Sequence, residues 1–207
     1  VALGTGLRIG EILGLKWSDI DFKNNLINIK RTSLYSKDRG IYQDTPKTEQ
    51  SKRSISVPAK VMELLRVYKK EYNTKRLALG TAWTDTGFIL VQENGKPMHP
   101  DTLTDYCSSF RTKYNNIIEK ENKDRPKTNK LPLLPHINPH AFRHSQASML
   151  ILSGLDCATV SKRLGHANIS TTTNIYTHIL HEADKKASDK LENILLNQNK
   201  QKQVILN

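Results

Sequence analysis

The sequence has few cysteines and no long hydrophobic run. Its two cysteines, Cys107 and Cys157, do not form a Cys-x-x-Cys pair. We therefore expect reduced thiols rather than a disulfide framework or a zinc site. The longest apolar runs, such as residues 149–152, fall far short of the roughly 20 residues that cross a bilayer. These absences exclude a disulfide-stapled scaffold and predict no transmembrane span.

Acidic residues are scarce relative to basic ones. The 207 residues include 32 Lys and Arg against 20 Asp and Glu, which gives a formal net charge of +12. Hydrophobic residues make up 37%, as in an ordinary globular protein, so the charge is carried by a folded body. This excess favours a polyanionic partner, either nucleic acid or an acidic membrane surface. The chain starts at Val1 without a Met or a basic-then-apolar leader, and we expect it to be an internal part of a longer protein.

Hydrophobic periodicity predicts an α+β fold, mainly α-helical, with a small antiparallel three-stranded sheet. Residues 26–31 and 53–57 alternate apolar and polar side chains, and residues 41–50 lie between them. These three segments are the predicted strands. Residues 88–91, followed by Asn94-Gly95, predict a further short extended segment and a turn.

The remaining pattern is mostly helical. Residues 1–16 have apolar positions at near-helical spacing but contain four glycines, which predicts a glycine-tolerant helix or a turn followed by a helix. An amphipathic helix with a basic outer face is predicted at 59–79, and a helix capped by Asp101 or Thr102 should run towards Glu121. The four prolines of residues 124–139 predict an irregular connection, after which helices resume near residues 140, 157 and 169.

Residues 158–173 have the pattern of two helices joined by a glycine turn. A helix-turn-helix of this kind can insert into the major groove of DNA. His166 falls in the turn itself, and Tyr176 lies beyond the part of the second helix that would reach bases. DNA reading alone therefore does not explain these two residues.

Three other segments contain basic residues that each have an ordinary explanation. His140 and Arg143 are three residues apart and share one helix face, usually a solvated one, while Phe142 should point to the core. Arg8 lies among apolar residues and glycines, where burial is costly without an anion, although Glu11 could pair with it. Lys47, on a connection between two predicted strands, would by itself be a solubilising charge.

Taken together and in this order, these residues resemble the tyrosine recombinase (phage integrase) family. The segment Thr5-Gly6-Leu7-Arg8-Ile9-Gly10-Glu11 is similar to the first arginine motif of the family, and Lys47 before Thr48 resembles its hairpin lysine. The remaining motifs are similar to His140-x-x-Arg143, Leu164-Gly165-His166 and Tyr176 in Ile-Tyr-Thr-His. The resemblance runs from Leu3 to about His181, and all six functional positions carry the family's residue type.

The resemblance implies a covalent DNA-cleaving mechanism. Arg8 and Arg143 would hold the scissile phosphate, and His166 would add a hydrogen bond. Tyr176 would attack, form a link to the DNA 3′ phosphate and release a 5′ hydroxyl that Lys47 protonates. The family role of His140 is to assist deprotonation of the tyrosine or to orient the phosphate, and Glu11 would position Arg8. No metal, ATP or other cofactor is implied.

The resemblance also implies a domain plan and a set of partners. Residues 1–180 would form a catalytic domain lacking its N-terminal start, and residues 181–207 a C-terminal helix and polar tail. That helix would dock on a neighbouring subunit of a homotetramer on synapsed DNA, unless it packs on its own domain. Double-stranded attachment sites are the expected substrate, with possible accessory directionality or DNA-bending factors, in the bacterial cytoplasm at the nucleoid. The candidates for contacts with DNA phosphates are Lys30, Arg31, Arg53 and Lys113.

Four functions are compatible with the sequence. The leading one is an integrase that inserts and excises a bacteriophage or an integrative mobile element. A chromosome-dimer or plasmid resolvase of the same family is the nearest alternative. A type IB topoisomerase-like enzyme shares the chemistry, but the Leu-Gly-His motif, the short chain and the C-terminal helix favour recombination. A non-catalytic helix-turn-helix regulator is the alternative from outside catalysis.

Overall fold

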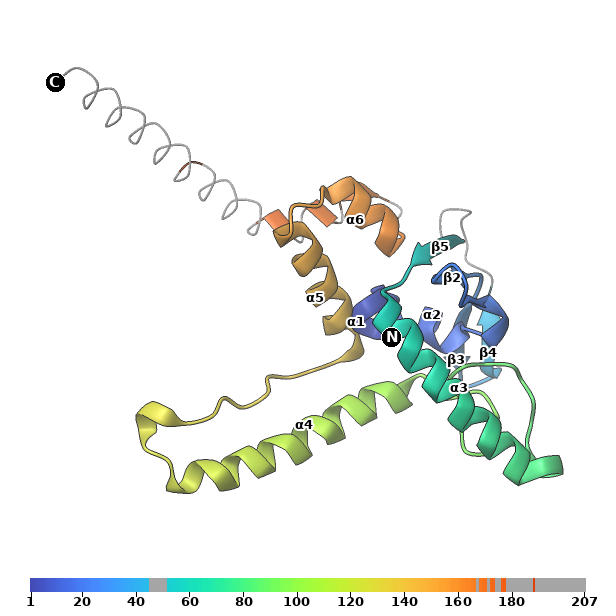
Figure 1. Ribbon diagram of the computed structural model, residues 1–207, viewed down its shortest axis with the longest axis horizontal. Helices are drawn as coiled ribbons and strands as arrows, with labels where there is room; N and C mark the ends of the chain where they lie inside the picture. Colours follow the sequence, from blue (N-terminus) through green and yellow to red (C-terminus); the bar gives the residue numbers. More distant parts are fainter. Residues whose placement is uncertain (45–51, 167, 171, 174–175, 178–187, 189–207) are drawn as a thin grey trace, which may run out of the picture. The chain divides into compact units, whose positions relative to one another are not determined.

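The computed structural model describes residues 1–44, 52–166, 168–170, 172–173, 176–177 and 188 (Figure 1). Within them the chain is mainly helical with short antiparallel strands, which confirms the predicted fold class. It divides into two compact units, Val1–Gln146 and Ala147–Asn207, which are described separately below. Cys107 and Cys157 are free thiols, as expected. Within this described part, no helix is both long and apolar enough to span a membrane.

The first unit begins with two short helices rather than the single helix that was one of the two predictions. Helix α1 (Ala2–Thr5) ends at Gly6, whose φ of 66° is in the left-handed region that glycine tolerates best. Helix α2 (Ile9–Gly14) follows after Leu7 and Arg8. A Cβ atom on Gly10 would lie 2.9 Å from the carbonyl oxygen of Ser33, so the glycine allows α2 to approach the neighbouring backbone closely.

The strands form two sheets. Strands β1 (Ile20–Asp21), β2 (Leu26–Ile29) and β5 (Arg53–Ser56) form an antiparallel three-stranded sheet in that order. Strands β3 (Thr32–Ser36) and β4 (Gly40–Asp44) form a separate hairpin.

The predicted sheet therefore has the right size but one wrong member. Residues 41–44 pair with 32–35 in the hairpin, and β1 takes the third place in the sheet. Short turns favour pairing between neighbouring segments, because they cost little chain entropy to close. Asn25, with φ of 54°, lies in the turn that pairs β1 with β2, and Gly40, with φ of 65°, begins β4.

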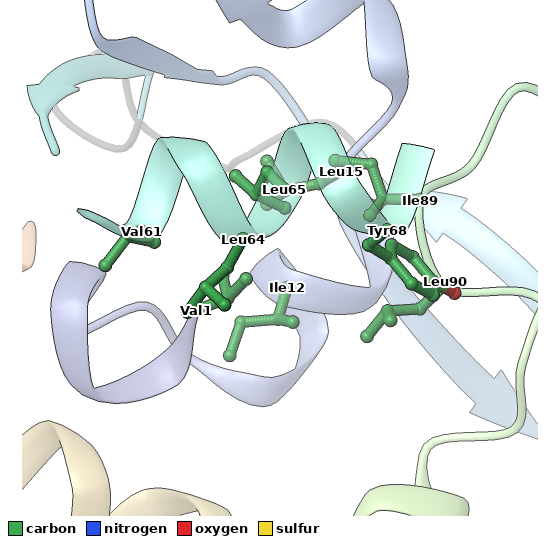
Figure 2. A pocket seen from close by; sticks show the side chains of 9 residues that line it. All are labelled: Val1, Ile12, Leu15, Val61, Leu64, Leu65, Tyr68, Ile89 and Leu90. Atoms are coloured by element: carbon green, nitrogen blue, oxygen red, sulfur yellow. The ribbon is translucent and has the colours of Figure 1, made fainter. Parts of the chain in front are cut away.

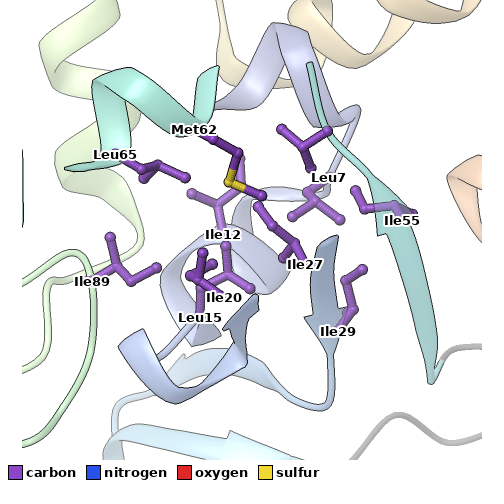
Figure 3. Packing of buried hydrophobic residues seen from close by; sticks show 11 residues of the cluster. Leu7, Ile12, Leu15, Ile20, Ile27, Ile29, Ile55, Met62, Leu65 and Ile89 are labelled. Atoms are coloured by element: carbon purple, nitrogen blue, oxygen red, sulfur yellow. The ribbon is translucent and has the colours of Figure 1, made fainter. Parts of the chain in front are cut away.

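A hydrophobic core joins the three-stranded sheet to the long helix α3 (Ala59–Leu79), which matches the predicted range (Figure 3). Met62 and Leu65 on the buried face of α3 pack against Ile27 of β2 and Ile55 of β5. The opposite face carries the predicted basic residues, and its exposed members include Lys60, Arg66, Lys70 and Lys75. The amphipathic pattern thus places the sheet and α2 on one side of α3 and leaves the positive charge in solvent.

Residues 88–97 and helix α4 (Asp101–Glu121) follow the predictions with one exception. Val91 pairs with Pro97 across a turn that contains Gly95, as expected for a short extended segment. Helix α4 is present over the predicted range, but its N-cap is Pro100 and no side chain caps it. The predicted cap by Asp101 or Thr102 is wrong, because the Pro100 backbone already has helical angles and both residues lie inside the helix.

The proline-rich connection after α4 is irregular, as predicted, apart from short 3-10 turns at Asn122–Asp124 and Lys127–Asn129. Two asparagines of the preceding segment hold it through paired backbone hydrogen bonds. Asn115 bonds both backbone groups of Leu134, at 2.8 and 3.0 Å, and Asn122 does the same with Leu131, at 2.8 and 2.9 Å. The connection is thereby fixed along α4 although it has no regular structure of its own.

The second unit has its own small core. It contains the last turns of helix α5 (Pro139–Leu152) and helix α6 (Cys157–Leu164). Asp156 caps α6 by accepting a 2.9 Å hydrogen bond from the backbone N–H of Thr159, and Gly165, with φ of 70°, ends it. The described residues between 169 and 177 are helical, which agrees with the predicted helix–turn–helix. The predicted docking helix at 181–207 lies outside the described residues except for Ser188.

Candidate active site

Arg8 occupies the junction between α1 and α2. Its extended backbone makes it the N-cap residue of α2. The Arg8 backbone N–H donates to Oε2 of Glu11 at 2.9 Å, and its Nη1 donates to Oε1 at 3.3 Å. The side chain of Arg8 is 43% exposed, whereas that of Glu11 is 5% exposed. The predicted positioning partner of Arg8 is therefore in contact with it, and the guanidinium still reaches solvent.

Glu11 also binds a second arginine, which the sequence did not reveal. Arg53, the first residue of β5, donates from Nη1 to Oε1 at 2.9 Å and from Nη2 to Oε2 at 3.1 Å. Its side chain is 9% exposed. Burial raises the pKa of Glu11, but the charges and hydrogen bonds from Arg53 and Arg8 together hold that pKa below its ordinary value. Glu11 is thus an ionised, buried carboxylate between two guanidinium groups.

Helix α5 brings Arg143 to the same junction. Arg143 is buried, and its Nη1 donates a 2.7 Å hydrogen bond to the carbonyl oxygen of Gly6, two residues before Arg8. The contact joins segments 137 residues apart in the sequence. It places two arginines predicted to bind phosphate at one junction of the first unit.

His140 lies one turn before Arg143 and is exposed. Its ring meets that of His144 edge to face, with centroids 4.7 Å apart. Partial burial lowers the pKa of His140 from its ordinary value, and the neighbouring His144, Arg143 and Arg8 lower this pKa further by electrostatic repulsion. The imidazole is therefore neutral at pH 7 and can accept a proton. Phe142, predicted to point into the core, is half-buried, and Arg143 takes the buried position on this turn.

The other predicted catalytic residues lie elsewhere in the chain. Lys47 is outside the described residues, between the end of β4 at Asp44 and the start of β5 at Arg53. His166 follows Gly165 in the second unit, where its backbone N–H donates to the carbonyl oxygen of Ser161 at 3.1 Å. Tyr176 belongs to the same unit and is 3% exposed, in a cluster with Ala147, Ile151, Val160 and Leu164.

Thr172, which the sequence did not single out, lies beside His166 in the second unit. Its hydroxyl lies 2.7 Å from Nδ1 of His166, and its side chain is fully buried. The hydrogen bond fixes the plane of the imidazole ring. Thr172 stands in a run of three threonines, so the sequence offers a signal for the residue type without indicating which threonine contacts the histidine.

The four basic residues predicted to contact DNA have different environments. Arg31 pairs with Asp19, a carboxylate that is 1% exposed, and donates to the carbonyl oxygen of Gly14 at 3.1 Å. Lys30 lies 3.4 Å from the same aspartate with its side chain 54% exposed. Lys113 is exposed on α4, and Arg53 is committed to Glu11 as described. The contacts of all four with DNA stay predictions.

Two hollows in the first unit differ sharply in character. One is an apolar cavity of about 210 Å³ between α3 and the N-terminal segment (Figure 2), lined by Val1, Ile12, Leu15, Val61, Leu64, Leu65, Tyr68, Ile89 and Leu90. Of the predicted catalytic residues that the structure describes, none lines this cavity. The other is a groove of about 490 Å³ along β2 and β5, lined by Asn28, Ile29, Lys30, Lys52, Arg53 and Ser54. The positive charges of this groove suit a phosphate backbone better than an apolar ligand.

The sequence is similar to those of known proteins. The sequence profile of the phage integrase family matches residues 1–183. The chain is 30% identical over 207 residues to a tyrosine recombinase XerC-like protein of Caldanaerobacter subterraneus subsp. tengcongensis, covering 95% of this chain and 48% of that protein. It is 32% identical over 195 residues to the ICEBs1 integrase of Bacillus subtilis, covering 94% and 48%.

A solved structure is also similar. The Tn1549 transposon integrase in complex with transposon right end DNA matches with a TM-score of 0.66 at 28% identity, over 91% of this chain and 56% of that one. The chain spans about half the length of the curated relatives it matches. The match of the family profile over most of the sequence shows that the chain belongs to the phage integrase family.

Proposed function

We propose that this chain is the catalytic part of a site-specific DNA recombinase that integrates and excises a bacteriophage or an integrative mobile element. The observation that carries the proposal is the bond from Arg143 to Gly6, because it brings the two predicted phosphate-binding arginines to one junction. Cleavage of a phosphodiester spreads negative charge over the nonbridging oxygens, and planar guanidinium groups match these oxygens with paired donors. Such preorganised donors stabilise the transition state without a metal ion.

The proposed reaction conserves the energy of the bond it breaks. The hydroxyl oxygen of Tyr176 attacks the phosphorus, a Tyr–O–P bond forms, and the bond from phosphorus to the 5′ oxygen breaks. The phenolic proton passes to a base, for which the neutral imidazole of His140 is suited. Lys47 gives a proton to the departing 5′ oxygen. In the reverse step a 5′ hydroxyl attacks the phosphotyrosine, so religation needs no ATP.

Double-stranded DNA is the proposed partner, and the reaction is proposed to occur in a homotetramer on synapsed DNA. The relatives support DNA as the substrate, since the Tn1549 integrase structure contains transposon DNA. The names of that protein and of the ICEBs1 integrase support a mobile element. The similarity to a tyrosine recombinase XerC-like protein supports recombination in general, and a chromosome-dimer or plasmid resolvase of the same family is the second candidate function.

A nicked duplex tests the proposal. The duplex spans the junction between the element that carries the gene and its host chromosome, with a nick that lets the short 5′ piece diffuse away after cleavage. We expect a protein–DNA adduct that survives denaturant, forms in excess EDTA, maps to Tyr176 and is lost in Tyr176→Phe. Sequence-specific binding without an adduct would support the non-catalytic regulator instead. An adduct formed on the dimer-resolution site of the chromosome, and not on the element junction, would favour the resolvase.

A further inference from the structure

The buried carboxylate of Glu11 is shared unequally by two arginines. Arg53 uses both Nη atoms, at 2.9 and 3.1 Å, in a bidentate pair. Arg8 contributes its backbone N–H at 2.9 Å and a longer 3.3 Å contact from Nη1. The side chain of Arg53 is 9% exposed and that of Arg8 is 43% exposed. The stronger partner of the carboxylate is therefore the buried arginine, and the weaker partner is the one that faces solvent.

The charges of the three groups explain why this division matters. Two guanidinium groups and one carboxylate carry a net charge of +1, and the exposed member is Arg8. If a neutral residue replaced Arg53, Arg8 and Glu11 would form an ion pair with no net charge. The Glu11 carboxylate would then compete with a DNA phosphate for the Arg8 guanidinium. Because the carboxylate is buried, its attraction for the guanidinium is stronger than it would be in water.

We propose that Arg53 is a positioning residue for phosphate binding by Arg8: it occupies the Glu11 carboxylate from β5 so that Arg8 keeps its positive charge for the scissile phosphate. The inference rests on the proposed function and deepens it. The prediction that Arg53 contacts DNA phosphates is the competing role, and the positioning role is favoured because both Nη atoms already donate to Glu11 and the side chain is nearly buried.

The location of Arg53 adds a second consequence. Arg53 is the first residue of β5 and pairs with Ile29 of β2, so its bond to Glu11 ties the start of this strand to α2. Lys47 precedes that strand by six residues. The ion pair of Arg53 with Glu11 thus holds α2, whose N-cap is Arg8. It also holds the start of β5, where the segment that carries Lys47 joins the sheet.

The test separates DNA binding from chemistry. We would measure the Kd for the junction duplex by fluorescence anisotropy, and the single-turnover rate of adduct formation on the nicked duplex at saturating protein. The variants are Arg53→Met, Arg53→Lys and the double variant Arg53→Met/Glu11→Gln. Arg76→Gln is the matched control, because it breaks an arginine–carboxylate pair with Asp85 and removes one positive charge on α3, outside the site.

We expect Arg53→Met to lower the single-turnover rate by about 10- to 100-fold, with Kd changed by less than about threefold. This loss is smaller than the roughly 100- to 1,000-fold for removal of a transition-state donor, because Arg8 itself is still present. Removing the carboxylate as well should recover about tenfold of the lost rate, because Glu11 then no longer competes with the phosphate for Arg8. The rate of Arg53→Lys should lie between those of the wild type and Arg53→Met, since an ammonium group keeps the positive charge but not the bidentate geometry. The control should keep the rate of the wild type.

Three results would overturn the inference. An Arg53→Met variant with a wild-type rate and a Kd weakened tenfold or more would make Arg53 a DNA contact. A double variant no faster than Arg53→Met would assign a purely structural role. Tryptophan fluorescence shows whether Arg53→Met folds. If it does not fold, the other two variants carry the test. A wild-type rate in Arg53→Lys, or a double variant more than about 100-fold slower than Arg53→Lys, would contradict the positioning role of Arg53. Absence of an adduct in the wild type would instead remove the proposed function, and this inference with it.

Discussion

The Nδ1 atom of His166 lies 2.7 Å from the hydroxyl oxygen of the buried Thr172. A partner at Nδ1 determines the tautomer of the ring and therefore what Nε2 can offer to a phosphate. We expect Thr172→Val, which keeps the shape and removes the hydroxyl, to slow adduct formation about tenfold, because the histidine loses this orientation. Thr173→Val is the matched control, since that hydroxyl donates to the carbonyl oxygen of Ile169. Equal rates in the two variants would contradict a role for Thr172.

Tyr176→Phe should distinguish the chemical role of the hydroxyl from the packing role of the ring. The ring is part of the core of the second unit, so the variant should keep its fold and its DNA affinity. Adduct formation should fall below detection, because the attacking oxygen is gone. Thermal unfolding followed by circular dichroism and anisotropy with the junction duplex provide the controls. An adduct formed by the purified variant would falsify the assignment of the nucleophile.

The pKa of His140 should report on Arg8. Burial first, and then the charges of His144, Arg143 and Arg8, lower it below its ordinary value. Arg8→Gln removes one of these charges, so the pKa of His140 should rise. Titration of the imidazole C–H signals by NMR measures the change, with Arg76→Gln as the control for a distant charge. A His140 pKa that is the same in Arg8→Gln and the wild type would show that the two groups do not share a site.

Glu11→Gln should destabilise the first unit in a pH-dependent manner. The substitution leaves the Arg53 guanidinium without its carboxylate, which costs about 3 kcal/mol for a buried pair. The native pKa of Glu11 is lowered, so its contribution is complete above the unfolded pKa of about 4.3 and is lost as the pH falls through the native pKa. The difference in unfolding free energy between the two proteins should therefore be largest at pH 7 and shrink below about pH 4. Urea unfolding followed by tryptophan fluorescence reports on this unit, because Trp17 and Trp83 both lie in it. A difference that stays constant with pH would mean that the charge of Glu11 is not responsible.

Gly10→Ala should destabilise the same unit by steric overlap. The new methyl group would lie 2.9 Å from the Ser33 carbonyl oxygen and 2.5 Å from a methyl carbon of Thr32, and backbone cannot yield as a side chain can. We expect a loss of about 1–3 kcal/mol in the same urea assay. Gly4→Ala is the comparison, since its methyl group would meet the side chain of Val61 at 2.7 Å, which can rotate. A smaller effect at Gly10 than at Gly4 would contradict this account.

Local patterns predicted the helices well and the strands less well. The range of α3 followed from apolar spacing, because this helix buries Met62, Leu65 and Tyr72 on one face. The range of α4 was predicted from a capping residue at 101 or 102, and although that cap is wrong the range is right, with Ile118 as the buried residue of the helix. Strand β1 has two residues, too few to show an alternating pattern, and its place depends on the turn at Asn25. The prediction therefore gave its position in the sheet to residues 41–50.

The candidate site was predictable as a set of residues but not as a set of contacts. The ordered motifs identified Arg8, His140 and Arg143, and the structure brings these three together. The pair of Arg53 with Glu11 spans 42 residues, and that of Arg31 with Asp19 spans 12. The three-residue spacing indicated the pair of Arg8 with Glu11, but nothing in composition or spacing indicates these two longer-range pairs. The carboxylate partners of Arg53 and Arg31 therefore emerge only from the folded chain.

The two buried carboxylates have a consequence for redesign of this protein. Replacing acidic residues by neutral ones raises the net charge and, in general, the electrostatic affinity for DNA. Exposed acids such as Glu63 and Asp38 are suitable for this purpose. Glu11 and Asp19 are not, because each anchors an arginine whose direction is lost when the anchor is removed. At these two positions a substitution that raises the net charge would also release the arginine that the carboxylate holds in place, so a more positive protein would have fewer arginines in a fixed orientation.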